Sequence, residues 1–440
     1  MIVIGAGIAG LAAASELGSG GCRVSVLEGR DRIGGRIWSL SIPHLDFSIE
    51  LGAEFIHGRP PEILGPLQQS GAQIIEVQGR SWCAFENRLR PCDFWSSIDS
   101  VLAQMDDSRP DESFLDFLRR AFPDSEKTGE AQRRALGYVV GFNAADPMLV
   151  GVHWLVQGMR AEEKIDGDRS FRTGNGYRDL LEVFHRNISE CRNVSIRTSK
   201  VVERVTWGRG KAEVIVRGSA KYEAFCASRV LITLPLALLK APAGEVGAVV
   251  FEPALPDEKI AAVDKLEMGK VMRIVLLFRE RFWDSITPTG SRASLSDMSF
   301  LLSDDEWFPT WWTSMPKKLP IITGWAPFRC AEHLSGQSGE FIVEHGLQTL
   351  GKLLNVDHRM LRDGLARAFF HDWQNDPFSR GAYSYGKVGS DGAHAALASP
   401  IDQTLFFAGE ATDTTGNNGT VHGAIASGYR AAAEILESFS

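Results

Sequence analysis

The chain has 440 residues, too many for one simple hydrophobic core, so two domains are expected. Apolar residues make up 44% of it and charged residues 23%, as in an ordinary globular protein, and no apolar run reaches the roughly 18 residues of a membrane span. The net charge of −8 disfavours nucleic acid as a main partner.

The first thirty residues have the pattern of a dinucleotide-binding turn. Gly5, Gly7 and Gly10 have the spacing G-x-G-x-x-G between a short apolar strand and an Ala-rich helix. The first glycine permits a tight turn, the second lets backbone N–H groups approach a pyrophosphate, and the third lets helix and strand pack closely. Glu28 follows the next apolar run, where it can accept hydrogen bonds from ribose hydroxyls, which argues against NADP. A segment used in this way is not a signal peptide.

Residues 29–36 suit an anionic dinucleotide cofactor whose second half also needs binding groups. They contain three arginines, Arg30, Arg32 and Arg36, and a pair of glycines. Arginine offers planar, permanently charged forks for phosphate, and glycines let the chain pass close to a flat ring. This combination predicts FAD rather than NAD.

The middle of the chain changes between helical and strand patterns. Residues 97–165 are mostly helical, with an apolar face that includes Phe114 and a break at Pro147. Residues 201–235 alternate as strands. Residues 243–370 mix both patterns and are rich in tryptophan, which predicts a second domain of sheet and helix.

The cysteines show no spacing typical of a metal or redox site. They occupy positions 22, 83, 92, 191, 226 and 330. We interpret all six as free thiols in a reducing compartment. The expectation is therefore a cytoplasmic protein without a metal site.

Motifs at both ends of the chain resemble those of the flavin-dependent amine oxidases, which include monoamine oxidases, polyamine oxidases and lysine-specific histone demethylases. Residues 28–36 resemble the second fingerprint of that family. Residues 51–58, Leu-Gly-Ala-Glu-Phe-Ile-His-Gly, resemble its next block in the polyamine-oxidase version. Residues 406–412 and 419–432 resemble the C-terminal FAD motif. The middle of the chain matches loosely.

The resemblance implies an α/β fold with two domains. A discontinuous, Rossmann-like FAD-binding domain would comprise residues 1–58, 166–240 and 371–440. A second, α+β substrate-binding domain would comprise residues 59–165 and 241–370. The substrate is expected between the two domains, where ligand pockets commonly form.

The same resemblance assigns cofactor contacts outside the glycine turn. Glu410 would bind the ribityl or phosphate region, although an acid at this place also suits a helix N-cap. The backbone N–H groups of Thr420 and Val421 would face the pyrimidine edge of the isoalloxazine, at a helix N-terminus that stabilises negative charge on reduced flavin. A backbone N–H near Val202 would reach the adenine. The expected cofactor contacts are Gly5, Gly7, Gly10, Glu28, Arg30, Arg36, Gly52, Ala53, Val202, Glu410, Thr420 and Val421.

The position that faces flavin N5 in the family holds a lysine, and here it is Arg273. The spacing to Gly269 and to the Phe-Trp pair at 282–283 fits the family pattern. Lys270 is three residues away and would point to the other face of a strand. Because arginine keeps its proton near neutral pH and has a different shape, reaction with oxygen is expected to be weak and another electron acceptor is possible. An ordinary salt bridge at Arg273 is the alternative.

Residues 373–385 resemble the block that lines the substrate side of the flavin. Tyr383 matches one wall of the aromatic slot that guides an amine, and Trp373 belongs to the same block; plain core packing is the alternative for each. Ala382 stands where monoamine oxidases carry the cysteine bound to FAD, so the cofactor is expected to be non-covalent. The opposite aromatic wall is missing, since Thr420 occupies one of the local candidate positions.

Substrate recognition is expected at His57 and Glu54. In the polyamine oxidases that the chain resembles, a histidine after this loop contacts a substrate nitrogen, although His57 could equally cap a loop. Glu54 could attract a distal ammonium or pair with a nearby arginine. The expected catalytic residues are Arg273, His57, Tyr383 and Trp373, and the expected substrate contacts are Glu54, His57, Tyr383 and Thr420.

These features predict an FAD-dependent amine oxidase acting on a polyamine or a monoamine. A neutral amine would deliver a hydride to flavin N5, water would hydrolyse the imine to an aldehyde, and O2 would reoxidise the flavin with release of H2O2. Three alternatives stay open: an L-amino-acid oxidase, an amine dehydrogenase that uses another acceptor, and a non-catalytic flavin-binding scaffold. A chromatin demethylase is not expected, because neither an extra N-terminal domain nor a long helical insertion is evident. Partners other than the amine and the acceptor, nucleic acid and membrane included, are not expected.

Overall fold

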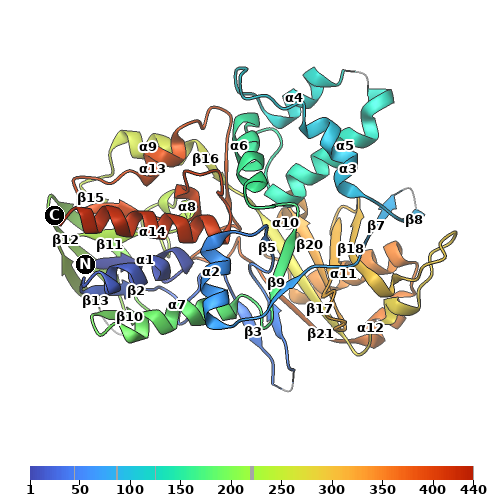
Figure 1. Cartoon of the computed structure of the whole chain (residues 1–440), viewed down its shortest axis with the longest axis horizontal. Helices are drawn as coiled ribbons and strands as arrows, with labels where there is room; N and C mark the ends of the chain where they lie inside the picture. Colours follow the sequence, from blue (N-terminus) through green and yellow to red (C-terminus); the bar gives the residue numbers. More distant parts are fainter. Residues whose placement is uncertain (44, 86–87, 124, 219–221, 440) are drawn as a thin grey trace.

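Two large sheets organise the chain, in a computed structural model that describes residues 1–43, 45–85, 88–123, 125–218 and 222–439. Figure 1 shows the layers around the parallel sheet on the left and those around the second sheet on the right. Both ends of the chain lie on the left, at the edge away from the second sheet (Figure 1).

The first sheet is parallel, in the order β10-β2-β1-β14-β23. Its strands are β1 (Ile2–Ile4), β2 (Val24–Leu27), β10 (Val194–Arg197), β14 (Val230–Ile232) and β23 (Leu405–Phe407). Alternate side chains of a strand point to opposite faces, so Val3 and Val26 pack under helices while Ile2 and Ile4 pack on a second layer of strands. The α/β, Rossmann-like fold expected from the sequence is confirmed.

Helices cover one face of this sheet and a small mixed sheet covers the other. The helices are α1 (Ile8–Ser19), α2 (Pro61–Ser70), α7 (Arg178–Glu190) and α14 (Val421–Glu437). Gly428 lets α14 lie directly on α1, because a Cβ there would be 2.4 Å from the oxygen of Ala9. The covering strands are β11 (Val201–Gly208), β12 (Lys211–Arg217), β13 (Tyr222–Ala227) and β15 (Val250–Glu252).

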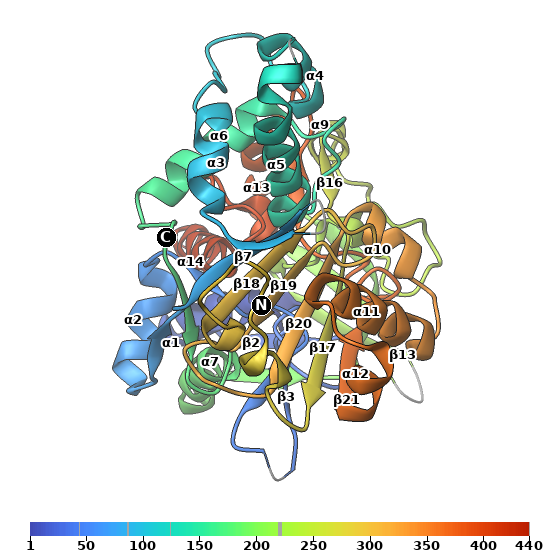
Figure 2. The same cartoon turned by 90° about the vertical axis from the view of Figure 1, so that its right-hand side faces the viewer.

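The second large sheet has the order β21-β17-β20-β19-β18-β7-β8. Its strands are β7 (Arg80–Phe85), β8 (Arg88–Pro91), β17 (Val271–Phe278), β18 (Met298–Ser303), β19 (Thr310–Thr313), β20 (Ile321–Pro327) and β21 (Leu365–His371). Helices α10 (Arg329–Leu334), α11 (Gly339–Leu354) and α12 (His358–Gly364) cover one face, as Figure 2 shows from the side. Met272, Ile274 and Leu276 of β17 face those helices, so Arg273 projects from the opposite face.

A helical group stands at the top of Figures 1 and 2. It consists of α3 (Phe94–Leu102), α4 (Phe114–Ala121), α5 (Ser125–Asn143) and α6 (Val152–Glu163). Phe114 and Phe117 lie in its core, as their apolar pattern predicts, and Pro147 lies in the break between α5 and α6. The side chain of Trp325 on β20 ties this group to the second sheet by donating a hydrogen bond to the oxygen of Gly141 at 2.8 Å.

Short elements join these layers. The strands are β3 (Ser39–Ser41), β4 (Ser48–Glu50), β5 (Ile56–His57), β6 (Ile74–Glu76), β9 (Ser170–Thr173), β16 (Leu266–Met268) and β22 (Ser384–Gly386). The helices are α8 (Leu236–Leu239), α9 (Asp257–Asp264), α13 (Ala393–Ala398) and the 3-10 turns η1 (Phe282–Ser285), η2 (Leu295–Asp297) and η3 (Glu410–Thr412). The division into domains at the expected boundaries stays a prediction, but α2 and β15 pack on the parallel-sheet layers.

One expectation about the cysteines is wrong. Cys83 and Cys92 form a disulfide, while Cys22, Cys191, Cys226 and Cys330 are free. The β7–β8 hairpin brings the two half-cystines together, because Cys92 lies opposite Ser81 and Cys83 is the next residue on the same face. The expectation of a reducing, cytoplasmic compartment rested on six free thiols, so the disulfide removes that argument.

No helix among the described residues has both the length and the apolar character that crossing a membrane requires.

Candidate cofactor and substrate site

A cavity of about 730 Å³ runs from the parallel sheet to the second sheet. Its walls begin at the carboxyl ends of β1, β2, β14 and β23, where open α/β sheets bind their ligands. They continue past β5 and the loop before α14 to the face of β17 and β19 that is turned away from helices α10, α11 and α12. One space therefore joins the glycine turn to the aromatic residues of the second sheet.

The glycine turn has the geometry that its sequence predicts. Gly5 has a φ of +104°, and its N–H donates to the oxygen of Leu27 at 2.8 Å. A Cβ on Gly10 would lie 2.1 Å from the oxygen of Gly5, so only glycine lets α1 begin so close to β1. Gly7 is the N-cap of α1 and lines the cavity, and a Cβ there would meet nothing within 4 Å. The N-terminus of α1 is thus open to an anionic ligand.

Glu28 and Arg30 lie at the nucleotide end of the cavity. The carboxylate of Glu28 is 4% exposed and accepts from the N–H groups of Ala6 at 2.8 Å and Arg30 at 2.9 Å. The guanidinium of Arg30 forms an ion pair with Asp376 at 2.6 Å. Although burial raises the pKa of Asp376, hydrogen bonding to His371 and the charge of Arg30 lower it to about 2. Arg30 is therefore held in place at the cavity wall.

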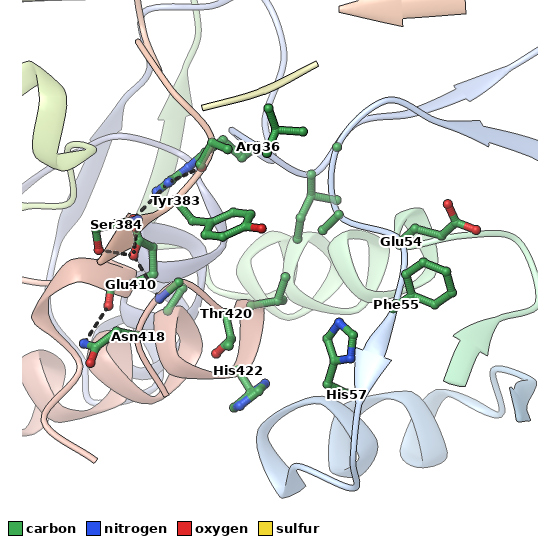
Figure 3. A pocket seen from close by; sticks show the side chains of 18 of the residues that line it. Arg36, Glu54, Phe55, His57, Tyr383, Ser384, Glu410, Asn418, Thr420 and His422 are labelled. Atoms are coloured by element: carbon green, nitrogen blue, oxygen red, sulfur yellow. Dashed lines mark hydrogen bonds and ion pairs between the residues drawn. The ribbon is translucent and has the colours of Figure 1, made fainter. Parts of the chain in front are cut away.

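Glu410 joins three segments at the other end of the cofactor region (Figure 3). Its carboxylate forms an ion pair with Arg36 at 2.9 Å and accepts from the hydroxyl of Ser384 at 2.6 Å and from the N–H of Gly419 at 3.0 Å. Thr420 caps α14, since its hydroxyl oxygen accepts from the N–H of Gly423 at 3.0 Å. The last helix therefore begins at Val421, as predicted, with its N-terminus at the cavity.

The residues expected to hold the cofactor fit FAD by their chemistry and placement. Gly5 and Gly7 of the glycine turn, Glu28, Arg30, Arg36 and the N-terminus of α14 line one cavity, whereas Gly10 is not among its lining residues. Gly52, Ala53 and Val202 line it as well. Gly52 packs against the backbone of Arg36, where a Cβ would lie 1.8 Å from the carbonyl oxygen.

Arg273 projects from β17 into the wall of the cavity and is 4% exposed. Its guanidinium donates to the oxygen of Gly52 at 2.7 Å and pairs with Glu54, and it lies 5.4 Å from the ring centre of Trp312. Lys270 precedes the strand and pairs with Glu332 at 2.6 Å outside the cavity. Both residues lie on the sides that the strand pattern predicts.

Glu54 has an arginine on each side. It accepts from Nε of Arg172 at 2.6 Å and from Nε1 of Trp312 at 3.0 Å, and it pairs with Arg273. Although burial raises the pKa of Glu54, the charges of Arg273 and Arg172 outweigh it and hold that pKa below its usual value. Of the two partners considered for Glu54, the arginine is the one found here.

His57 lies at the end of β5, and the centre of its ring is 6.0 Å from that of Phe55 and 5.0 Å from that of Phe142. No hydrogen bond to its ring nitrogens is found among the described residues, and burial lowers its pKa to about 4. Burial also lowers the pKa of His422 to about 3, and its Nε2 lies 3.1 Å from Oδ1 of Asn417. Figure 3 shows both imidazoles on the same side of the pocket. A neutral His57 can accept a hydrogen bond from an amine.

Tyr383 and Trp373 line the cavity, and the polar group of each side chain donates a hydrogen bond. The hydroxyl of Tyr383 donates to the oxygen of Phe142 at 2.6 Å, and burial raises its pKa. Nε1 of Trp373 donates to the oxygen of Leu51 at 2.8 Å. Both rings line the cavity, and Trp373 is 5% exposed. These hydrogen bonds hold each ring in one orientation.

Sequence reasoning missed Glu162, at the end of α6. It lines the cavity, burial raises its pKa to about 7, and no hydrogen bond or ion pair of its carboxylate is found among the described residues. Asp168, which follows Glu162 closely in the sequence and is exposed, also lines the cavity. Glu162 and Glu163 are two adjacent acids in the last turn of an amphipathic helix, a pattern typical of surface charge, so no sequence signal distinguished Glu162.

Comparisons with known proteins relate most of the chain to one family. A family model described as flavin-containing amine oxidoreductase matches residues 8–76 and 93–436. A lysine-specific histone demethylase 1 homolog 2 of Arabidopsis thaliana is 29% identical over 99% of this chain and 58% of that protein. Polyamine oxidase 3 of rice, Oryza sativa subsp. japonica, is 27% identical over 100% of this chain and 90% of that protein. This chain spans between about a third and three fifths of the demethylase homologues that it matches.

Solved structures show the same fold. Putrescine oxidase bound to putrescine superposes with a TM-score of 0.81 at 19% identity, covering 99% of this chain and 98% of the other. Cyclohexylamine oxidase from Brevibacterium oxydans superposes with a TM-score of 0.79 at 19% identity, covering 100% and 98%.

Proposed function

The chain belongs to the flavin-containing amine oxidoreductase family, and on that premise we propose that it oxidises a small amine at the aromatic end of the large cavity. The observation that carries the proposal is the continuity of that cavity, from the glycine turn to His57, Tyr383 and Trp312. An amine that enters at the aromatic end meets a cofactor held at the other end. The bound FAD would supply the acceptor for the hydride of the amine's α-carbon.

The protein residues bind and orient the amine. Neutral His57 accepts a hydrogen bond from the reacting nitrogen, and the fixed ring of Tyr383 packs against the apolar part of the substrate. Phe55 and Phe142 exclude water around His57. No strong base is required when the amine is neutral. Arg273 stays charged and holds the loop at Gly52 through its hydrogen bond.

The acid best placed for a second ammonium is Glu162 rather than Glu54. Glu54 is paired with Arg172 and Arg273, whereas Glu162 lines the cavity and no hydrogen bond or ion pair of its carboxylate is found among the described residues. An ammonium would hold Glu162 in its charged form. We therefore favour a diamine or polyamine over a monoamine as the substrate.

An amine dehydrogenase is the second candidate, because Arg273 stands where the family has its lysine. Flavin reduced by the amine would then react slowly with air and rapidly with an artificial acceptor. A non-catalytic scaffold would bind FAD and be reduced by no amine. The L-amino-acid oxidase alternative lacks support, since both terminal nitrogens of Arg273 are occupied and Arg59 does not line the cavity.

One experiment separates these functions. The FAD-loaded protein is mixed without oxygen with spermine, spermidine, putrescine, simple monoamines, a methylated lysine peptide and L-amino acids. Air is then admitted. Bleaching of the flavin by an amine supports the proposal, and the recovery of colour in air measures the oxidase activity. Bleaching by amino acids alone, or by none of these compounds, contradicts it. The expected cytoplasmic location is tested separately, by fractionation of cells that produce the protein.

A further inference from the structure

A second cavity, of about 80 Å³, lies behind Arg273. Arg273, Glu54 and Trp312 line this cavity as well as the large one, so they form the wall between the two. The remaining walls come from β4, β9 and the segments around β19 and β20. The second cavity therefore reaches the side of Arg273 that faces away from the cofactor region.

Three polar side-chain atoms, one from each of three residues that line this cavity, are buried and have no hydrogen-bond partner among the described residues. They are Nε of Arg273, Oε1 of Glu50 and Oγ1 of Thr173. They come from β17, β4 and β9, which are far apart in the sequence. Buried polar atoms are normally hydrogen-bonded, and ordered water fills the need where a cavity is polar and large enough. A water takes up about 30 Å³ of liquid, so this cavity can hold at least two.

The three groups suit water as their common partner. The guanidinium of Arg273 can only donate, and the hydroxyl of Thr173 can donate and accept. Burial raises the pKa of Glu50 to about 8, so its carboxyl is neutral at pH 7 and can also do both. The groups that face Glu50 are the hydroxyl of Ser39, which donates to Oε2 at 2.9 Å, the backbone at Tyr177, and the charges of Arg273 and Glu54.

Arg273 is also held unequally. Its terminal nitrogens bond to Gly52, which lines the large cavity, and to Glu54, which lines both cavities, while its Nε has no partner among the described residues. An acceptor in the second cavity that takes a hydrogen bond from Nε would fix the remaining freedom of the guanidinium. Glu50 and Thr173 also line the second cavity, and each has one buried side-chain oxygen without a partner among the described residues.

We propose that the cavity behind Arg273 is a hydrated site of at least two ordered waters, through which Glu50 acts as a positioning residue for Arg273. The water accepts from Nε of Arg273 and bonds to the carboxyl of Glu50 and the hydroxyl of Thr173. The site itself does not depend on the reaction. Its effect on turnover rests on the proposed amine oxidation.

The site is tested by a high-resolution crystal structure of the FAD-loaded protein. We expect waters within hydrogen-bond distance of Nε of Arg273, Oε1 of Glu50 and Oγ1 of Thr173. The infrared spectrum should contain the C=O band of a protonated carboxyl that shifts in D2O and is missing in Glu50→Gln. A dry cavity, or a structure in which these three atoms bond to one another directly, overturns the proposal.

The positioning role is tested with three variants. Glu50→Gln keeps a neutral polar group of the same shape, so we expect the waters and kcat to stay within about twofold of the original. Glu50→Leu and Thr173→Val keep the volume but remove a partner, and we expect kcat to fall roughly tenfold with little change in KM. Equal kcat in all four proteins, together with an unmoved Arg273, overturns the role. If no amine reduces the flavin, the proposed function fails, while the crystal and infrared results still decide the hydrated site.

Discussion

Arg273 donates a hydrogen bond to the backbone oxygen of Gly52 at 2.7 Å, so a strand of the second sheet holds a loop that lines the cofactor region. The same guanidinium pairs with Glu54, two residues further along that loop. A lysine could not reach both partners with a planar fork. Arg273 therefore links the second sheet to the loop at Gly52 and Glu54 through two contacts.

Arg273→Lys should make the reduced protein react faster with oxygen, by roughly tenfold, because it restores the residue that the family has at this position. The change should also cost about 1–3 kcal/mol of stability, since Glu54 and Gly52 lose buried donors. Stopped-flow reoxidation in aerated buffer measures the first effect and chemical denaturation the second. Lys270→Met, at an exposed site outside the cavity, is the control and should change neither. Unchanged reoxidation in Arg273→Lys would contradict the assignment.

Glu162→Gln should lower kcat/KM for putrescine and spermine by roughly tenfold and leave a monoamine of similar length within twofold, because only the former carry a second ammonium. Glu163→Gln is the matched control, because Glu163 is next to Glu162 in the sequence but is exposed and is not among the residues that line the cavity. Steady-state rates with each amine provide the comparison. Equal losses for both kinds of amine would show that Glu162 supports the cavity wall instead.

Activity should rise with pH until the substrate amine is neutral. Burial lowers the pKa of His57 to about 4, so this group stays neutral above pH 5 and adds no inflection of its own. The rate of anaerobic flavin reduction, followed from pH 6 to 10, gives the profile. A flat profile with the chemical step rate-limiting would speak against a neutral amine as the reactive form.

The contribution of Glu50 to the free energy of unfolding should fall as the pH rises from about 4.5 to 8. Burial raises its pKa to about 8 in the folded protein, so the folded state binds the proton more tightly than the unfolded state does. Ionisation of the unfolded chain then favours unfolding, by a few kcal/mol once the pH exceeds the folded pKa. Glu50→Gln removes this dependence and should be more stable than the original at pH 9. Parallel denaturation curves of both proteins at pH 5 and pH 9 test this.

The cofactor should be released intact by acid precipitation. The resemblance to the family matches Ala382 with the cysteine that monoamine oxidases link to FAD, and the backbone oxygen of Ala382 accepts a hydrogen bond from Arg36 at 2.7 Å. The supernatant should contain all of the yellow colour. Colour that stays with the precipitated protein would reveal a covalent link.

Local patterns predicted the parts of the fold that depend on local physics. The glycine turn, the strand before Glu28 and the start of α14 at Val421 are determined by glycine conformation, apolar runs and a capping threonine. The cysteine prediction failed because it considered metal and redox spacing and not the pairing of two strands in a hairpin.

The rest of the site depends on segments that only the fold brings together. Glu54 obtains its two arginines from β9 and β17, more than a hundred residues away along the chain. The cavity behind Arg273 has walls from several such segments, so no single stretch of sequence contains its pattern. Glu162 belongs to the same class, because its burial follows from where α6 lies against the cavity.

The most direct measurement is the visible spectrum of the purified protein, supplied with FAD and then mixed with an amine in the absence of oxygen. The account predicts a bound, oxidised flavin spectrum that bleaches with at least one di- or polyamine. A protein that gains no flavin absorbance, or whose flavin keeps its colour with every amine, would contradict it.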